Sequence, residues 1–346
     1  MIEVFVNGRH AARLRLLPLV VVAALFATGC SSDSTSPAPS NGQEPPVVAT
    51  APGLASVTYT GIPYGPFGLW TLNKLLYGPA PFTASHNYIN ADSLVLQINA
   101  ARAKGHRLMT AMTGGATAKY VTNGNFDLTK WKAVMNGYNK SALKTAVAAA
   151  VADGTIIGNS MVDEPETKKW GTTMTKPVID QMAVYVKTIF PTLPVGVDHG
   201  PNGYTWRTAE KYTKLDYVVY QYAWWITKGN LTSWRDGVLA RASLDGVKPA
   251  FSINVVNGGV QDKGDGVYDC IGTGMAGKGQ RYPLCHMTTD QIKTWGKALT
   301  PLGCAMFLWW YDTPWTSFFN DAGNQAAFKE LATLAASKPK PSCKKP

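Results

Sequence analysis

Several patterns that identify common classes of protein are missing from this chain of 346 residues. No G-x-G-x-x-G loop follows its first apolar segment, which argues against a dinucleotide-binding sheet. It has no G-x-S-x-G, H-x-H or H-E-x-x-H pattern, and its cysteines form no close Cys-x-x-Cys or Cys-x-x-His pair. No basic run interleaved with aromatic residues points to nucleic acid. We therefore expect no metal, no cofactor and no nucleic-acid partner.

A long hydrophobic run is also missing, but the chain begins with a short one. Three arginines precede an apolar run, Leu16 to Ala27, which is too short to span a bilayer as a mature helix and is typical of a signal peptide over residues 1–29. The sequence Ala-Thr-Gly-Cys that ends at Cys30 resembles the cleavage box of bacterial lipoproteins. This resemblance implies cleavage before Cys30 and lipid attachment to its thiol. Ordinary secretion with Cys30 as a spare thiol is the alternative.

Cysteine is scarce, with five in the chain. Without Cys30 the number is even, which suits disulfides in an oxidising compartment. We favour the pairs Cys270 with Cys285 and Cys304 with Cys343. Residues 30–53 are rich in Ser, Pro and Gly and have no hydrophobic period, so we expect a tether.

The chain is strongly basic, with a formal net charge of +11. A basic surface could meet acidic glycans, nucleic acid or anionic headgroups. Lysines near the end of the chain are interpreted as a solvated tail.

From residue 54 onward, apolar segments rich in β-branched residues alternate with segments of helical period. This alternation predicts an α/β fold, a single-domain (β/α)8 TIM barrel over 54–346. A doubly wound open sheet is the second choice. The eight predicted strands are 56–62, 83–90, 107–112, 155–163, 193–197, 216–222, 248–256 and 304–311.

One stretch, TIIGNSMVDEP from Thr155 to Pro165, combines a buried strand with two carboxylates at its end. Desolvation raises the pKa of a carboxyl group, which suits a proton donor. The alternative is that Asp163 and Glu164 only cap the helix that follows.

Aromatic, carboxylate and amide side chains collect at the predicted strand ends. Aromatic faces cover the apolar faces of sugar rings, while amides and carboxylates bind hydroxyl groups, so the set predicts a carbohydrate cleft. Some of these aromatic residues are expected to be core instead. The predicted substrate-binding residues are Tyr64, Trp70, His199, Gln221, Tyr222, Trp224, Asn254, Trp309 and Trp310.

With Asp-Glu-Pro closing the fourth strand and tryptophan closing the eighth, the chain resembles the clan-A glycoside hydrolases, whose fourth strand ends in Asn-Glu-Pro. The resemblance implies that Glu164 is the general acid/base and that Asp163 stands where an asparagine contacts the sugar 2-hydroxyl. It also implies a nucleophilic glutamate at the end of the seventh strand, where this chain has Asn254. Asp198 and Asp312, at the ends of the fifth and eighth strands, are the candidate partners of Glu164, with Asp262, Asp265 and Asp269 on the following loop as further options.

The expected function is hydrolysis of glycosidic bonds in an extracellular or periplasmic polysaccharide. The expected protein is a monomer, anchored by lipid at the cell envelope, at the outer membrane if the cell is Gram-negative, or secreted. A non-catalytic glycan-binding lipoprotein on the same barrel is the main alternative. A structural surface protein with buried aromatic residues is the third.

Overall fold

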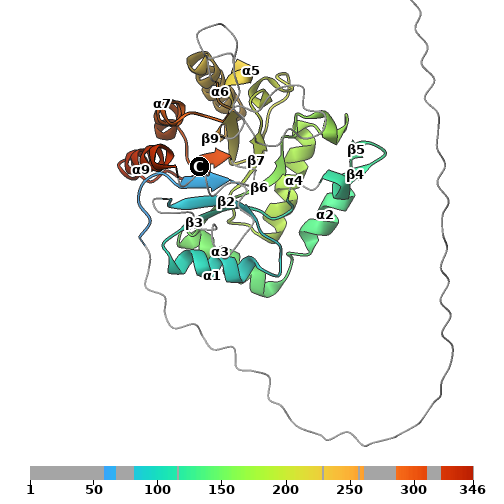
Figure 1. Cartoon of the computed structure of the whole chain (residues 1–346). Helices are drawn as coiled ribbons and strands as arrows, with labels where there is room; N and C mark the ends of the chain where they lie inside the picture. The colour runs from blue at the N-terminus through green and yellow to red at the C-terminus, as the bar shows by residue number, and fades with distance from the viewer. Residues whose placement is uncertain are drawn as a thin grey trace, which may run out of the picture. The chain divides into compact units, whose positions relative to one another are not determined.

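A computed structural model describes residues 58–67, 82–114, 117–227, 230–255, 258–260, 286–309 and 321–345. Eight parallel strands form a closed barrel in the order β1-β10-β9-β8-β7-β6-β3-β2, which confirms the predicted (β/α)8 fold (Figure 1). The strands are β1 (Tyr64–Phe67), β2 (Ala84–Tyr88), β3 (Arg107–Ala111), β6 (Ile156–Asp163), β7 (Val195–His199), β8 (Tyr217–Tyr222), β9 (Lys248–Asn254) and β10 (Met306–Trp309).

Helices surround the strands, and a small hairpin of β4 (Val121–Thr122) and β5 (Asn125–Phe126) precedes α2. Among the described residues, no helix has the length and apolar character needed to cross a membrane. The helices are α1 (Leu94–Ala103), α2 (Leu128–Asn136), α3 (Ser141–Ala152), α4 (Lys176–Ile189), α5 (Trp224–Thr227), α6 (Leu231–Asp245), α7 (Thr289–Leu299) and α9 (Ala322–Ala336).

The side chains of β8 alternate between two apolar clusters. On β8, Val218 and Tyr220 belong to the cluster shared with the helices, whereas Tyr217 and Val219 belong to a second cluster inside the barrel. The Tyr217 ring occupies space that two glycines leave open, because a Cβ on Gly158 or Gly196 would lie 2.6 or 2.5 Å from its ring atoms. The interior of the barrel is therefore packed with side chains, as in other eight-stranded barrels.

The first strand was predicted in the wrong place. Residues 58–62 form no strand, and the ladder with β10 begins at Tyr64, after Pro63. The Ile62 amide donates instead to the Ala335 carbonyl of α9 at 2.9 Å, and the Tyr59 hydroxyl contacts the Thr155 hydroxyl at 3.0 Å. These contacts hold the segment across the end of the barrel where the strands begin.

The disulfide between Cys304 and Cys343 is present as predicted. Both cysteines are buried in the cluster inside the barrel, so the bond attaches the end of the chain to the start of β10. Cys30, Cys270 and Cys285 lie outside the described residues.

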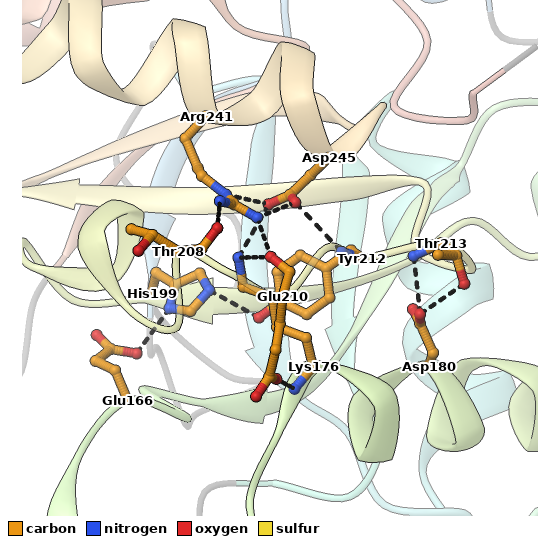
Figure 2. Close-up of polar contacts among 10 residues, drawn as sticks. All are labelled: Glu166, Lys176, Asp180, His199, Thr208, Glu210, Tyr212, Thr213, Arg241 and Asp245. Carbon is orange, nitrogen blue, oxygen red and sulfur yellow. Dashed lines mark hydrogen bonds and ion pairs between the residues drawn. The ribbon is translucent and has the colours of Figure 1, made fainter.

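The connection between β7 and β8 contains one short 3-10 turn, Gly203–Thr205, in place of an α-helix. A buried ion cluster holds this connection against α4 and α6 (Figure 2). The Asp245 carboxylate accepts from Lys176 Nζ at 3.3 Å, from Arg241 Nε at 2.8 Å and from the Tyr212 amide at 3.2 Å. The Lys176 and Asp245 side chains are each 1% exposed.

We predict that Asp245→Asn destabilises the protein by about 3 to 5 kcal/mol, because it leaves two buried cations without their carboxylate. Asp236→Asn is the matched control on the same helix. The Asp236 side chain is 57% exposed and pairs only with its neighbour Arg235 among the ion pairs of the described residues, so a change below about 1 kcal/mol is expected. Urea unfolding followed by circular dichroism measures both. Equal midpoints for the two variants would contradict the assigned role of the cluster.

Candidate active site at the carboxyl ends of the strands

The candidate site begins where β6 ends, at Asp163 and Glu164. Glu164 has φ +45°, a left-handed conformation that is uncommon for residues other than glycine. Its amide donates to the Asp198 carbonyl at 2.7 Å, and its carbonyl accepts from the Thr167 hydroxyl at 2.8 Å. Trp170 Nε1 lies 3.1 Å from the carbonyl oxygens of both Asp163 and Glu164. These contacts stabilise a strained turn of the kind that is frequent at functional sites.

The turn brings two consecutive carboxylates to the same cation. Lys169 Nζ lies 3.4 Å from Asp163 Oδ2 and 3.6 Å from Glu164 Oε2. Consecutive side chains of a regular strand would point to opposite faces. The side chains of Asp163 and Glu164 are 40% and 37% exposed, so both can reach a ligand from solvent.

The surroundings make these two groups weaker acids than usual. Desolvation by the surrounding strand ends raises the pKa of Asp163 to about 7, and the charges of Glu164 and Asp198 add to the effect while Lys169 opposes it. Desolvation also raises the pKa of Glu164. The positive charge of Lys169 lowers this pKa, and the negative charge of Glu166 raises it further. A carboxyl group that keeps its proton at higher pH is suited to general acid chemistry.

A third carboxylate, Glu166, lies beside the pair and was missed by the sequence analysis. Glu166 Oε2 contacts His199 Nδ1 at 2.7 Å, and His199 Nε2 contacts the Tyr212 hydroxyl at 2.9 Å (Figure 2). Glu166 Oε1 also accepts a hydrogen bond from the Gly200 amide at 2.6 Å. A Cβ on Gly200 would lie 2.9 Å from Glu166 Oε1 and 3.1 Å from Glu164 Oε1. Because Gly200 has no side chain, the carboxylates of Glu164 and Glu166 can both lie against its backbone. The signal in the sequence was the spacing Asp-Glu-Pro-Glu.

Two predicted site residues, His199 and Asp198, are buried. His199 is 2% exposed between Glu166 and Tyr212, so it positions Glu166 and does not face the solvent. Asp198 is 6% exposed and accepts from the Ser160 hydroxyl at 2.8 Å, with His86 Nε2 at 3.2 Å. Its carboxylate is thus engaged inside the barrel, which disfavours its predicted role as the partner of Glu164.

Two predicted sugar-binding tyrosines are fully buried on the outer face of their strands. The Tyr64 ring packs against Phe82, with centroids 5.6 Å apart. The Tyr222 ring packs edge-on against Trp234 and Trp295, with centroids 5.2 and 5.0 Å apart. The Tyr222 ring therefore packs α6 and α7 against the barrel, and the Tyr64 ring is buried in the same apolar cluster, so neither ring is placed to contact a ligand.

Four further predicted residues, Gln221, Trp224, Asn254 and Trp309, lie at or near the ends of β8, β9 and β10. Asn254 Nδ2 donates to Gln221 Oε1 at 3.0 Å, and both side chains are largely buried. Trp224 and Trp309 are partly exposed. Trp70, Trp310 and Asp312 lie outside the described residues. Within the described part of the chain, no group of three or more His, Cys, Asp or Glu side chains is arranged to hold a metal ion.

The fold defines the chain as a (β/α)8 barrel, and the solved structures to which it is similar include glycosidases. A GH113 β-1,4-mannanase is 10% identical, with a TM-score of 0.48 over 80% of this chain and 99% of the mannanase. Xylanase 10B from Thermotoga maritima is 11% identical, with a TM-score of 0.41 over 80% of this chain and 95% of the xylanase. The β-glucuronidase of Faecalibacterium prausnitzii is 11% identical, with a TM-score of 0.46 over 80% of this chain and 49% of its own length.

No family model matches the sequence, and no curated protein matches it. At these identities the solved structures bear on the fold alone. The function is therefore argued from the side chains of the site.

We predict that Asp163→Asn stabilises the protein at pH 8 by about 1 kcal/mol, a figure reduced for the partial exposure of the side chain. The raised pKa means that, between about pH 4 and pH 7, the folded state holds a proton that the unfolded state has released. Stability of the parent therefore falls as pH rises through this window, and the asparagine variant is spared the loss. Thermal unfolding at pH 4 and pH 8 measures the effect. A variant less stable than the parent at pH 8 would contradict the assigned shift.

Proposed function

We propose that this protein hydrolyses glycosidic bonds in a polysaccharide of the cell envelope or its surroundings, with Glu164 as the proton donor. The observation that carries the proposal is the left-handed turn that presents Asp163 and Glu164 together at the carboxyl ends of the barrel strands. Active sites of (β/α)8 enzymes occupy this end. A raised pKa at Glu164 supports the role of acid, because a donor must be protonated when it meets the glycosidic oxygen.

Asp163 is proposed to hold the substituent at carbon 2 of the sugar. Because it neighbours Glu164 on one strand, it approaches the sugar from the same side and is poorly placed to act across the ring from the acid. A carboxylate there accepts a hydrogen bond from a 2-hydroxyl or from the N–H of a 2-acetamido group. The partner of Glu164 then comes from another strand end, where Asp312 and Asp262 stay proposals. Otherwise it is the 2-acetamido group itself, whose carbonyl oxygen attacks the anomeric carbon as the protonated leaving group departs, as in substrate-assisted glycosidases.

Two partly exposed tryptophans support a sugar as the substrate. Trp224 follows β8 and Trp309 ends β10, so both lie on the same side of the barrel as Glu164. Indole rings stack on the apolar faces of pyranoses. Trp70 and Trp310 are proposed to extend this surface.

Glycan binding without hydrolysis is the second candidate, and one observation favours it. The clan-A resemblance implies a nucleophilic glutamate at the end of β9, but this strand ends in Asn254. The side-chain amide of Asn254 donates a hydrogen bond to Gln221 Oε1. A barrel with an acid but no attacking group would still bind sugars.

The test of hydrolysis is Glu164→Gln, with Glu330→Gln as a matched control on α9, remote in sequence from the site. We predict a loss of about 100-fold to 10,000-fold in kcat for Glu164→Gln, because the amide cannot donate the proton, and no change for Glu330→Gln. Activity is measured as reducing-sugar release from a polysaccharide panel and on aryl glycosides with 2-hydroxyl or 2-acetamido groups. Melting temperatures confirm that both variants are folded.

The outcomes separate the two candidates. Full activity in Glu164→Gln would remove Glu164 as the acid. Calorimetric binding of an oligosaccharide by parent and variant, with no turnover by either, would instead establish the glycan-binding role.

A further inference from the structure

The end of the barrel opposite the candidate site is rich in lysine. All eight strands are parallel, so the residues that precede each strand share this end. Lys104 precedes β3, Lys214 precedes β8 and Lys248 begins β9. The set called the basic end consists of Lys104, Lys187, Lys214, Lys248, Lys340, Lys344 and Lys345.

The end of the chain contributes three of these lysines. The bond between Cys343 and Cys304 fixes the tail next to the start of β10. On one side of this bond, Lys340 Nζ lies 5.6 Å from the centre of the Tyr59 ring. On the other side, Lys345 Nζ donates to the Thr213 carbonyl at 3.0 Å. The tail therefore runs across the end of the barrel and does not extend freely into solvent.

The carboxylates near this end are already paired. Arg102 Nε lies 2.7 Å from Asp153, and Lys187 Nζ lies 2.8 Å from Asp216, whose side chain is 2% exposed. Asp180 accepts from the amides of Thr213 and Lys214 at 2.8 and 2.9 Å. Lysine thus dominates the exposed charge of the basic end, whereas the candidate site displays carboxylates.

A hollow of about 470 Å³ lies within the basic end. Val184, which is 48% exposed, gives the hollow an apolar side. Cations beside an exposed aliphatic side chain suit a phosphate group attached to a lipid glycerol. The lining residues are Val184, Lys187, Thr188, Thr213, Lys214 and Lys345.

The N-terminal part of the chain reaches the barrel at this same end. Tyr59 bonds to Thr155, which precedes β6, and Arg107 Nη1 donates to the Gly61 carbonyl at 2.8 Å. A segment of the length of residues 30–53 can span at most roughly 80 to 86 Å, even when fully extended. If Cys30 carries the proposed lipid, this short tether draws the basic end, and not the candidate site, toward the membrane.

We propose that the basic end docks on an anionic membrane surface, so that the candidate site faces away from the lipid. Each lysine close to an anionic surface strengthens binding by roughly fivefold, and the attraction decays within a Debye length. Because these contributions multiply, several lysines at one end of the barrel together raise the affinity for an anionic membrane by several orders of magnitude. The proposal does not depend on the reaction at Glu164.

The test uses the compact unit of residues 53–346, which contains all eight strands of the closed barrel and lacks the apolar run and Cys30. Cosedimentation measures its partition onto vesicles of phosphatidylcholine, with and without phosphatidylglycerol. We expect binding only to the mixed vesicles, weakened by added salt. Reversal of three lysines, Lys214→Glu, Lys344→Glu and Lys345→Glu, should lower the partition coefficient by at least about 100-fold.

The matched control makes the same change in net charge elsewhere. Lys119, Lys144 and Lys329 are exposed lysines outside the basic end, and their reversal to Glu should cost much less binding. Amine labelling provides a second readout, in which vesicles protect Lys344 and Lys345 but leave Lys119 reactive. Equal losses in the two triple variants, equal binding to neutral vesicles, or binding to a soluble polyanion without binding to vesicles would overturn the proposal.

Discussion

The hydrogen bond from the Glu164 amide to the Asp198 carbonyl is the contact on which the candidate site depends. It extends the pairing of β6 with β7 by one residue while Glu164 already has a left-handed backbone. Such a conformation costs of order 1 to 3 kcal/mol and persists only when its surroundings determine it. Thr167 and Trp170 supply the other contacts, through the carbonyl groups of the turn. The turn is thus held by its backbone, which leaves both carboxylates free to meet Lys169 and a ligand.

The positions of the charges follow from the parallel barrel. Carboxylates that follow a strand collect at one end of the barrel, and lysines that precede a strand collect at the other. The buried charges of Asp245, Lys176 and Arg241 are paired with one another, and they hold the connection between β7 and β8 against α4 and α6 (Figure 2). This separation of charge would let one end act on a substrate while the other faces an anionic surface. The two proposals are therefore compatible in one molecule.

The barrel was predictable from sequence because buried parallel strands are continuous apolar runs, and seven of eight fell close to their predicted positions. The exception is the predicted first strand, at residues 56–62. It has the composition of a strand, but the hydrogen bonds of its described residues go to α9 and to side chains. The Asp-Glu pair was predictable from its place after a buried strand. The tyrosine assignments failed because composition does not tell which face of a strand a residue occupies, and Tyr64 and Tyr222 face the helices. Glu166 was missed because its partner His199 is 33 residues away in the chain.

The arrangement of the carboxylates limits the chemistry that the site can perform. A retaining glycosidase needs its two carboxyl groups on opposite sides of the anomeric carbon, about 5 to 5.5 Å apart, and an inverting one needs roughly 6.5 to 9.5 Å. Asp163 and Glu164 leave one strand and meet one ammonium group, so they act from the same side. Glu166 is held by His199 and by the Gly200 amide, and Asp198 by Ser160 and His86. Any group that attacks from the far side must therefore come from another strand end or from the substrate. In the proposed reaction, the part of the sugar that matters most is therefore the substituent at carbon 2, which Asp163 is proposed to hold.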